Sequence, residues 1–344
     1  MRALVALPYA NPHLGLFYQW VQSKFDCDFY VFGDVQQHRS NIQIEQYPMQ
    51  SIDRSTASNN VRSGLYTAVF MHGMFYPETL FLLSAKSTRV IILTEPIAPG
   101  KRSFLTRLYK KLISKWLTKR HDVSLLLLGP LMAKDAFEQL AGKKIYSTAY
   151  GYFPITGQHL NRKAPQVQPV EVVFAGQLIE RKNIDLILQA AQLSSSVRNG
   201  QCRITIAGDG PLKDAVQASP DVTYYGLADR TALPELFSKS DILLLPSKYD
   251  GWGAVVNEAA ACGCMVLLGQ QVMASALFLK ENETGLFASA DAQALVAQLD
   301  ALCSNPDYIS KMKSGMQKHY SILLQTHDSL LENHFAHATT TAYL

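Results

Sequence analysis

The chain has 344 residues, more than a single hydrophobic core of about 100–200 residues accommodates, so two domains are expected. Hydrophobic residues make up 48% of the chain and charged residues 17%, and the mean hydropathy is near zero, which excludes a disordered chain and a membrane-embedded one. The formal net charge of +4 is too small by itself to indicate a nucleic-acid partner.

The N-terminal segment and the cysteines bear on the cellular compartment. Residues 3–7 are apolar but are followed by Pro8, so this run is too short for a secretory signal and reads as a first buried strand. The five cysteines are odd in number and have no Cys-x-x-Cys spacing. No apolar run approaches the roughly 18 residues that a membrane-spanning helix needs. We therefore expect a cytoplasmic protein whose membrane contact is peripheral.

Short apolar runs alternate with helix-length segments through the first half of the chain, which predicts an α/β domain with a parallel sheet. The predicted strands are residues 3–7, 27–32, 66–71, 89–93 and 124–128. His72 follows the third of these strands and Glu95 the fourth, and ligands bind at the carboxyl ends of parallel strands. Both are candidate site residues, and the alternative for Glu95 is an exposed turn carboxylate.

Asp26-Cys27-Asp28 is a short acidic motif of a kind that can hold a metal ion. It lies at the second predicted strand, without the structural context that such a motif needs. No other group of His, Cys or acidic residues has the spacing of a metal site. We therefore predict neither a metal site nor a cofactor.

Residues 101–120 contain eight Lys or Arg residues and no acid, with apolar residues at helical spacing between them. Such a helix is typical of binding to anionic lipid, where each basic residue contributes about 1 kcal/mol near the surface. The alternative is a core-packed helix with a basic outer face. Nucleic acid is not expected, because no nucleic-acid-binding motif accompanies the charges. The predicted membrane-binding residues are Lys101, Arg102, Arg107, Lys110, Lys111, Lys115, Trp116, Lys119 and Arg120.

Residues 161–169 are polar and contain two prolines, which is typical of a linker. The strand and helix alternation then resumes and ends in a predicted helix from Pro306 to about His337. The predicted strands are residues 171–175, 203–207, 222–225, 241–245 and 265–268. The expected organisation is a first domain at 1–162, a linker at 163–169 and a second domain at 170–344. Two such domains leave a cleft between them for ligands.

Three loops of the second half carry the chemistry. Arg181 and Lys182 precede a predicted helix, where cations oppose the helix dipole unless an anion is bound, although a plain surface pair is the alternative. Gly208-Asp209-Gly210-Pro211 forms a turn after another strand. Asp250 and Glu258 flank a glycine turn and a helix start, where backbone N–H groups can hold an anion or hydroxyls. Taken alone, that pair could be a helix-capping Asp and a solvent-facing Glu.

Together these motifs resemble the retaining glycosyltransferases of family four (GT4), which have the GT-B fold of two Rossmann-like domains. The family signature is an acidic residue, seven others and a glutamate, followed by Ala and a Gly-containing turn. Asp250 and Glu258 match it, with aspartate in place of the usual first glutamate. The resemblance covers about residues 170–287, while the first half matches in rhythm only.

The resemblance implies roles for individual residues. Arg181 and Lys182 would stabilise the leaving diphosphate, although Gln177 stands where many members have an arginine. Asp250 would contact the donor sugar and Glu258 the ribose. Gly15 would belong to the loop facing acceptor and diphosphate. From their places at strand ends, we expect His72 on the acceptor side and Glu95 among the catalytic residues, in contact with the acceptor or the transferring sugar. The remaining donor-binding residues would be Gly176, Gly208, Gly210, Gly251, Trp252 and Gly253.

The expected function is metal-independent hexosyl or related transfer from a UDP- or GDP-sugar to a hydroxyl of a lipid-linked or membrane-associated glycan acceptor, with retention of configuration. Such an enzyme would serve polysaccharide or glycolipid assembly, as a peripheral protein on the inner face of the cytoplasmic membrane. The alternatives are a GT-B sugar-nucleotide epimerase or phosphorylase, and a non-catalytic subunit that binds nucleotide or membrane. The shortened acid at Asp250 and the missing arginine at Gln177 keep the last alternative open.

Overall fold

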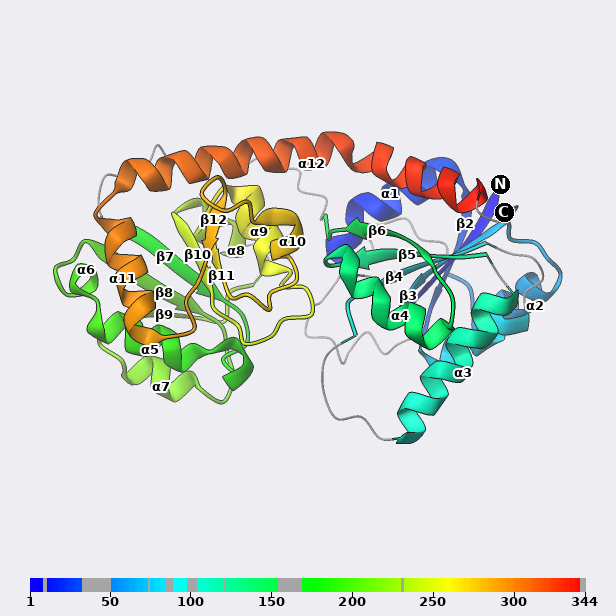
Figure 1. Cartoon of the computed structure of the whole chain (residues 1–344), viewed down its shortest axis with the longest axis horizontal. Helices are drawn as coiled ribbons and strands as arrows, with labels where there is room; N and C mark the ends of the chain where they lie inside the picture. The colour runs from blue at the N-terminus through cyan, green and yellow to red at the C-terminus, as the bar shows by residue number, and fades with distance from the viewer. Residues whose placement is uncertain are drawn as a thin grey trace. The chain divides into compact units, whose positions relative to one another are not determined.

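The computed structural model forms two compact units, each with one parallel six-stranded sheet flanked by helices (Figure 1). Unit 1 consists of Met1–Ile155 and His327–Leu344, and unit 2 of Thr156–Thr326. This architecture confirms the predicted α/β fold class. The structure describes residues 1–8, 11–32, 51–73, 75–84, 89–97, 104–120, 122–153, 169–229 and 232–340.

In unit 1 the strand order is β2-β1-β3-β4-β5-β6. The strands are β1 (Arg2–Leu7), β2 (Asp26–Val31), β3 (Ala68–His72), β4 (Arg89–Thr94), β5 (Asp122–Leu128) and β6 (Tyr146–Tyr150). The central strands β4 and β5 are almost wholly buried runs of Val, Ile and Leu, as expected for a parallel sheet covered on both faces. The helical segments are η1 (Pro12–Leu14), α1 (Gly15–Lys24), α2 (Arg54–Arg62), η3 (Pro77–Ser84), α3 (Phe104–Arg120), η4 (Leu131–Ala133) and α4 (Lys134–Ala141).

In unit 2 the strand order is β12-β11-β10-β7-β8-β9. The strands are β7 (Val170–Ala175), β8 (Cys202–Ala207), β9 (Thr223–Gly226), β10 (Ile242–Leu245), β11 (Met265–Leu268) and β12 (Gly285–Phe287). The helical segments are η5 (Glu180–Lys182), α5 (Ile184–Leu193), α6 (Ser195–Arg198), α7 (Lys213–Ala218), α8 (Ala232–Ser238), α9 (Val255–Cys262), α10 (Ser275–Phe278), α11 (Ala292–Cys303) and α12 (Pro306–Thr340).

Both sheets contain a point at which the strand order reverses. In unit 1 it lies between β1 and β3, and in unit 2 between β7 and β10. The loops after the two strands at such a point diverge to opposite faces of the sheet and leave a crevice at their carboxyl ends, where open α/β sheets bind ligands. The loop after β7 carries the predicted basic pair, and the loop after β10 carries Asp250.

The last helix, α12, is divided between the units. Its turns up to Thr326 belong to unit 2, and from His327 onward the chain packs on unit 1. Leu331 is buried there. The Arg89 guanidinium lies over the Phe335 ring at 4.3 Å, and the same ring meets the Phe25 ring edge-to-face at 5.2 Å. The sequence-based boundary kept the whole helix in domain 170–344, because a helical pattern does not show which sheet its side chains contact. The expected linker lies outside the described residues except for Pro169.

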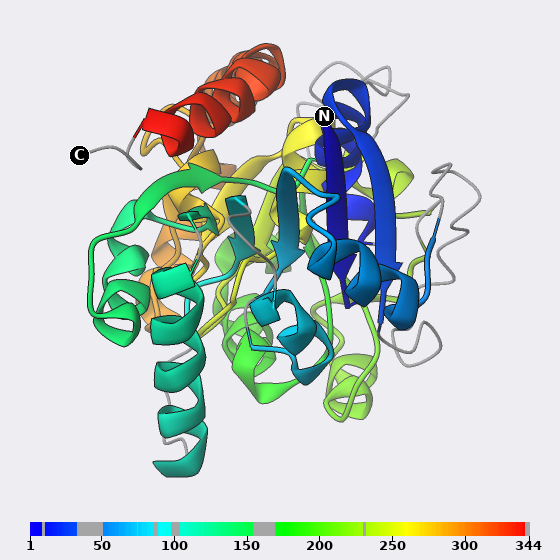
Figure 2. The same ribbon diagram turned by 90° about the vertical axis from the view of Figure 1, so that its right-hand side faces the viewer.

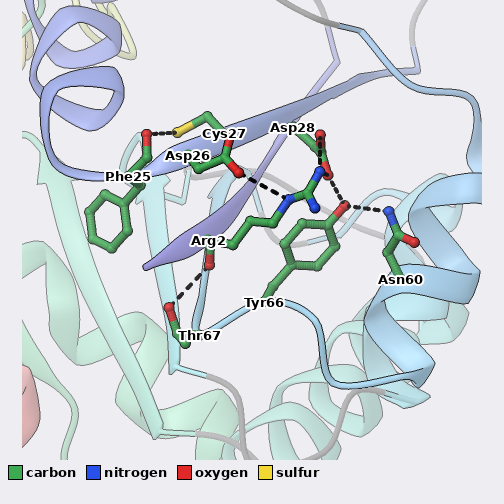
Figure 3. A network of polar contacts seen from close by, with 8 residues as sticks. All are labelled: Arg2, Phe25, Asp26, Cys27, Asp28, Asn60, Tyr66 and Thr67. Atoms are coloured by element: carbon green, nitrogen blue, oxygen red, sulfur yellow. Dashed lines mark hydrogen bonds and ion pairs between the residues drawn. The ribbon is translucent and has the colours of Figure 1, made fainter.

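The Asp26-Cys27-Asp28 motif contributes to a structural network on β2 (Figure 3). Asp28 is buried, and its carboxylate accepts hydrogen bonds from the Tyr66 hydroxyl at 2.6 Å and from Arg2 Nη2 at 3.3 Å. Asn60 Nδ2 donates to the same tyrosine oxygen at 3.1 Å. The network joins β1, β2 and α2, and protein groups occupy the Asp28 carboxylate on both oxygens.

Candidate functional site

The basic turn after β7 is a single 3-10 turn, η5, which is followed by Asn183 as its C-cap. Asn183 has a left-handed φ of 60°, a conformation that asparagine tolerates better than most residues. Its side-chain amide donates to the Pro246 carbonyl at 3.3 Å, and the Lys248 N–H donates to the Arg181 carbonyl at 2.9 Å. The turn is therefore attached to the loop after β10, the neighbouring strand of the sheet.

These attachments bring the two predicted charged motifs into direct contact. The Lys182 ammonium donates to Asp250 Oδ2, across 68 residues of chain, and both side chains are nearly buried. Arg181 Nη1 lies 3.4 Å from Asp250 Oδ1 and donates to the Tyr249 carbonyl at 2.5 Å. The Asp250 N–H in turn donates to the Gln271 carbonyl at 2.9 Å, so Asp250 is held by its backbone as well.

This cluster of Arg181, Lys182 and Asp250 has two cations and one carboxylate, a surplus of one positive charge. The side chain of Arg181 is 40% exposed, whereas those of Lys182 and Asp250 are near 10%. A charge that is shielded from water acts more strongly on a bound anion than one in bulk solvent. The arrangement therefore suits an anionic ligand that approaches from the Arg181 side.

Glu258 lies in the first turn of α9 and is half-buried. The helix begins at Val255 and has Ala254 at its N-cap, without a side-chain cap. Asp250 is thus not the capping residue that the alternative interpretation of the motif requires. The N–H groups of Val256 and Asn257 donate to the Gly253 and Ala254 carbonyls at 2.8 and 3.0 Å, so an anion at this helix start would meet the N–H groups that precede them.

Three glycines of the predicted donor site are required by the local structure. A Cβ at Gly208 would lie 1.9 Å from the Gly176 carbonyl oxygen, and one at Gly210 2.6 Å from the Leu178 carbonyl, so both allow adjacent loops to pack closely. Gly253 has a φ of +91°, which side chains rarely adopt, and a Cβ there would meet Val272 at 3.0 Å. Close packing of the loops therefore accounts for these glycines without a ligand.

Trp252 differs from its predicted place in the donor site. Its indole is buried and donates through Nε1 to Asn257 Oδ1 at 2.7 Å. The ring also packs edge-on against Phe278. Only the backbone of Trp252 is therefore placed to meet a ligand, because burial of the apolar ring turns the side chain into the core.

In unit 1 the predicted residues His72 and Glu95 both meet Tyr152. The Tyr152 hydroxyl donates to Glu95 Oε1 at 3.3 Å and lies 3.4 Å from His72 Nε2. Burial lowers the pKa of His72 to about 4, so the imidazole is neutral at pH 7. Glu95 is exposed but not an isolated turn carboxylate. Tyr152 was not predicted from the sequence, because β6, the strand that precedes it, was not predicted either. The tyrosines at both ends of Tyr146–Tyr150 are the available signal.

Gly15 is the first residue of α1, the helix that follows β1, and it is buried. The N–H of the next residue donates to the Phe153 carbonyl at 3.1 Å, and the His13 ring lies 6.0 Å from that of Tyr152. The predicted acceptor-side residues thus gather around the segment that follows β6.

The basic segment forms α3, as predicted, and Figure 2 shows its first turns extending past the strands of unit 1. It packs on its own unit through Ser114, Leu117 and Thr118, which are buried. The opposite side exposes an apolar stripe of Leu105, Leu108, Leu112 and Trp116. The basic residues Arg107, Lys111, Lys115 and Lys119 are exposed, and Lys110 Nζ lies 4.6 Å from the centre of the Phe75 ring. Lys101, Arg102 and the Arg120 side chain lie outside the described residues.

Two features are absent from the described residues. No three or more His, Cys, Asp or Glu side chains among them gather in a way that could hold a metal ion. Within the same part of the chain, no helix combines the length and apolarity that crossing a bilayer requires.

Comparison with known proteins matches residues 158–319 to the family model of glycosyl transferases group 1. An uncharacterised protein of the cps region of Klebsiella pneumoniae is 26% identical over 144 residues, 41% of this chain and 39% of that protein. The glycogen synthase of Mycobacterium tuberculosis is 31% identical over 108 residues, 29% of this chain and 26% of its own length. The matched segments thus span well under half of these relatives.

Solved structures extend the likeness to the whole fold. HepE of Anabaena, crystallised with UDP, superimposes with a TM-score of 0.73 at 15% identity, over 100% of both chains. The lipopolysaccharide outer core galactosyltransferase WaaB gives a TM-score of 0.67 at 12% identity, covering 97% of this chain and 99% of its own. At such identities the likeness shows the fold alone. Together with the family match it confirms the resemblance to family four: this chain has the GT-B fold, and its second half belongs to the glycosyl transferases group 1 family.

Proposed function

We propose that this protein is a retaining glycosyltransferase that moves a sugar from a UDP- or GDP-sugar to a hydroxyl of a lipid-linked or membrane-associated glycan acceptor. The observation that carries the proposal is the contact of Lys182 and Arg181 with Asp250 at the point where the strand order of unit 2 reverses. The motifs to which the resemblance assigns the diphosphate and the sugar meet there. HepE, with the same fold, binds UDP.

In this mechanism unit 2 stabilises the leaving group. Negative charge grows on the β-phosphate oxygen as the glycosidic bond breaks, and Lys182, Arg181 and the N–H groups at the start of α9 stabilise it. Asp250 holds the ammonium of Lys182 before the donor binds and accepts hydrogen bonds from sugar hydroxyls afterwards. The acceptor hydroxyl attacks from the face that the phosphate leaves and gives its proton to the departing phosphate oxygen. The configuration is therefore retained, and no metal is required.

The other predicted residues bind rather than react. Glu258 accepts hydrogen bonds from the ribose hydroxyls. In unit 1, Glu95 and Gly15 contribute to acceptor binding, and His72 does so as a neutral hydrogen-bonding group because its pKa is lowered by burial to about 4. Tyr152 orients Glu95 and His72, since its hydroxyl lies between them.

The test replaces one charged residue at a time. We expect Lys182→Ala and Glu258→Ala each to lower kcat/KM about 10²–10³-fold, because each removes a charged contact to the donor in a partly buried site. Lys239→Ala and Glu235→Ala are matched controls, since these residues form an exposed ion pair at the end of α8, and their loss should change the rate less than twofold. Circular dichroism checks that every variant is folded. Transfer at the wild-type rate by either site variant would refute the assignment.

Incubation with donor alone separates the alternatives. An epimerase would convert the sugar without any acceptor, and a non-catalytic subunit would bind nucleotide without slow hydrolysis of the donor. A thermal-shift panel of nucleoside diphosphates, followed by their sugar conjugates, identifies the base and then the sugar.

We further propose that α3 holds the enzyme on the cytoplasmic face of an anionic membrane, close to a lipid-linked acceptor. Two features of α3 support this: the exposed apolar stripe and the exposed basic residues that flank it. The helix packs on unit 1 through Ser114, Leu117 and Thr118, and the apolar stripe on its other side is exposed. The Lys110–Phe75 contact places α3 beside the segment that follows His72, a predicted acceptor residue.

Liposome sedimentation tests this proposal. Leu105→Glu/Leu112→Glu should lower binding to phosphatidylglycerol vesicles at least tenfold, because two exposed apolar side chains that would enter the lipid become charged. Leu193→Glu, at an exposed leucine of α5, should bind as the wild type does. Equal binding of the wild type to phosphatidylcholine and phosphatidylglycerol vesicles, or no binding to either, would count against α3 as a membrane surface.

A further inference from the structure

A buried polar pair connects the two ends of the acidic motif in unit 2. Trp252 Nε1 donates to Asn257 Oδ1 at 2.7 Å, and the two residues are 2% and 0% exposed. Trp252 comes two residues after Asp250, and Asn257 one residue before Glu258. The hydrogen bond therefore closes a loop that contains Gly253 and the start of α9.

A buried asparagine in the first turn of a helix lowers the stability of the fold unless its amide makes a specific hydrogen bond. Asparagine is a weak helix former, and burying an amide without a partner costs on the order of 1–3 kcal/mol. An apolar pair of similar shape would fill the same space at no such cost. What an amide adds is direction, because the indole N–H must point at Oδ1 for the bond to form.

Backbone hydrogen bonds restrict the rest of the loop between Asp250 and α9. The Trp252 carbonyl accepts a hydrogen bond from the Ala274 N–H at 2.9 Å, and the Asp250 N–H donates to the Gln271 carbonyl at 2.9 Å. Gly253 takes a φ of +91° between the tryptophan and the helix. With the indole anchored on α9, the distance between Asp250 and the helix that carries Glu258 is set within the core.

We propose that Asn257 is a positioning residue: through Trp252 it sets the spacing of Asp250 and Glu258, and hence how a nucleotide sugar bridges them. The inference rests on the proposed function. Asn257 itself does not contact the substrate. A displacement of about 1 Å at a reacting centre can cost about 100-fold in rate, so a small shift of the loop is sufficient.

The experiment uses three variants of the full chain. Asn257→Leu removes the acceptor, Trp252→Phe removes the donor but keeps an aromatic ring, and Trp252→Phe/Asn257→Leu replaces both with apolar groups. The double variant should have a higher Tm than either single variant, because the indole N–H and the amide oxygen that bond each other are removed together. We expect it to be folded and yet to lose about 10- to 100-fold in kcat/KM for UDP-glucose, with a raised KM.

Binding measurements separate positioning from stability. In calorimetry the double variant should bind UDP within about threefold of the wild type but bind UDP-glucose at least tenfold more weakly, because only the sugar depends on the spacing. GDP and GDP-mannose replace these probes if the wild type prefers guanine. Ser240→Ala, which removes a hydrogen bond to the Leu236 carbonyl at the amino end of β10, is the control for stability alone and should leave KM unchanged.

A folded double variant with wild-type KM and UDP-glucose affinity overturns the inference. So does failure of all three variants to fold, because the bond is then a fold-stabilising contact only. If the wild type itself neither binds nor transfers from any sugar nucleotide, the proposed function fails, and that result is distinct from both.

Discussion

Asp28 and Asp250 are both buried carboxylates that contact an arginine, yet their surroundings differ. The Asp28 carboxylate is occupied by Tyr66 and Arg2 on both oxygens, and the ring of Tyr66 is itself buried (Figure 3). Asp250 is paired with Lys182 and with a half-exposed Arg181, which leaves an excess of positive charge. The first arrangement is self-contained, whereas the second can accept an anion.

This contrast predicts different effects of substitution. Asp28→Ala should lower the free energy of unfolding by about 1–3 kcal/mol, because the buried Tyr66 hydroxyl loses its acceptor. Transfer per folded molecule, with or without added Mn²⁺, should stay as in the wild type. Urea unfolding and a rate assay measure the two effects. Asp26→Ala is the control, since that side chain is 77% exposed; lost transfer at unchanged stability would contradict the structural role.

At the scale of elements, the end of α12 is fastened to unit 1 by buried histidines. His334 Nδ1 lies 2.8 Å from Thr148 Oγ1, and its Nε2 lies 2.9 Å from Ser124 Oγ. His327 Nε2 lies 2.7 Å from the Tyr150 hydroxyl. Burial lowers the pKa of both imidazoles, that of His334 to about 4. The helix end is therefore held by neutral histidines against β5 and β6.

Acid should weaken this attachment. Because the pKa of His334 is lower in the folded chain than its ordinary value of 6.5, the unfolded chain binds more protons between pH 6.5 and about 4. The free energy of unfolding should thus fall as the pH is lowered through this window, by on the order of 3 kcal/mol for His334 alone. Urea unfolding at pH 7 and 4.5 should show a smaller fall for His334→Asn than for the wild type. His337→Asn, at an exposed histidine, is the control. An equal fall in the free energy of unfolding in all three proteins would show that His334 does not contribute to the pH dependence.

At the scale of the whole molecule, unit 1 is built from both ends of the chain. Residues 327–344 follow unit 2 in the sequence but belong to unit 1. The contacts of His327, His334 and Phe335 with β4, β5 and β6 are therefore among the longest-range in the sequence. Unit 1 can complete these contacts only when the last helix has formed.

Truncation tests this dependence. A chain ending at Thr326 should lose hydrogen-exchange protection in β5 and β6 of unit 1, because buried partners of these strands are removed. Protection in β7 and β10 of unit 2 should change little. A chain ending at Thr340 is the control, since it keeps all of α12. Equal loss of protection in both units would contradict the division of the chain at His327.

Much of the fold follows from local pattern. Strands such as β4 and β10 are continuous apolar runs, and α3 and α12 have helical periodicity, so each is predictable from its own residues. The candidate donor residues could be found because Arg181, Lys182 and Asp250 directly follow such strands. The short strands β6 and β12 lack a comparable run and were not predicted, and Tyr152 was missed with β6.

The α/β class, the family of the second half and the charged motifs of its loops can all be predicted from the residues alone, because they depend on residues close together in the chain. The three-dimensional fold is needed to see that β7 and β10 are neighbours, which brings Lys182 to Asp250. It alone decided that Trp252 faces Asn257 and that the last helix ends on unit 1. Such pairings arise because residues far apart in the chain bury apolar area against one another. The spacing of residues along the chain does not indicate which of them will do so.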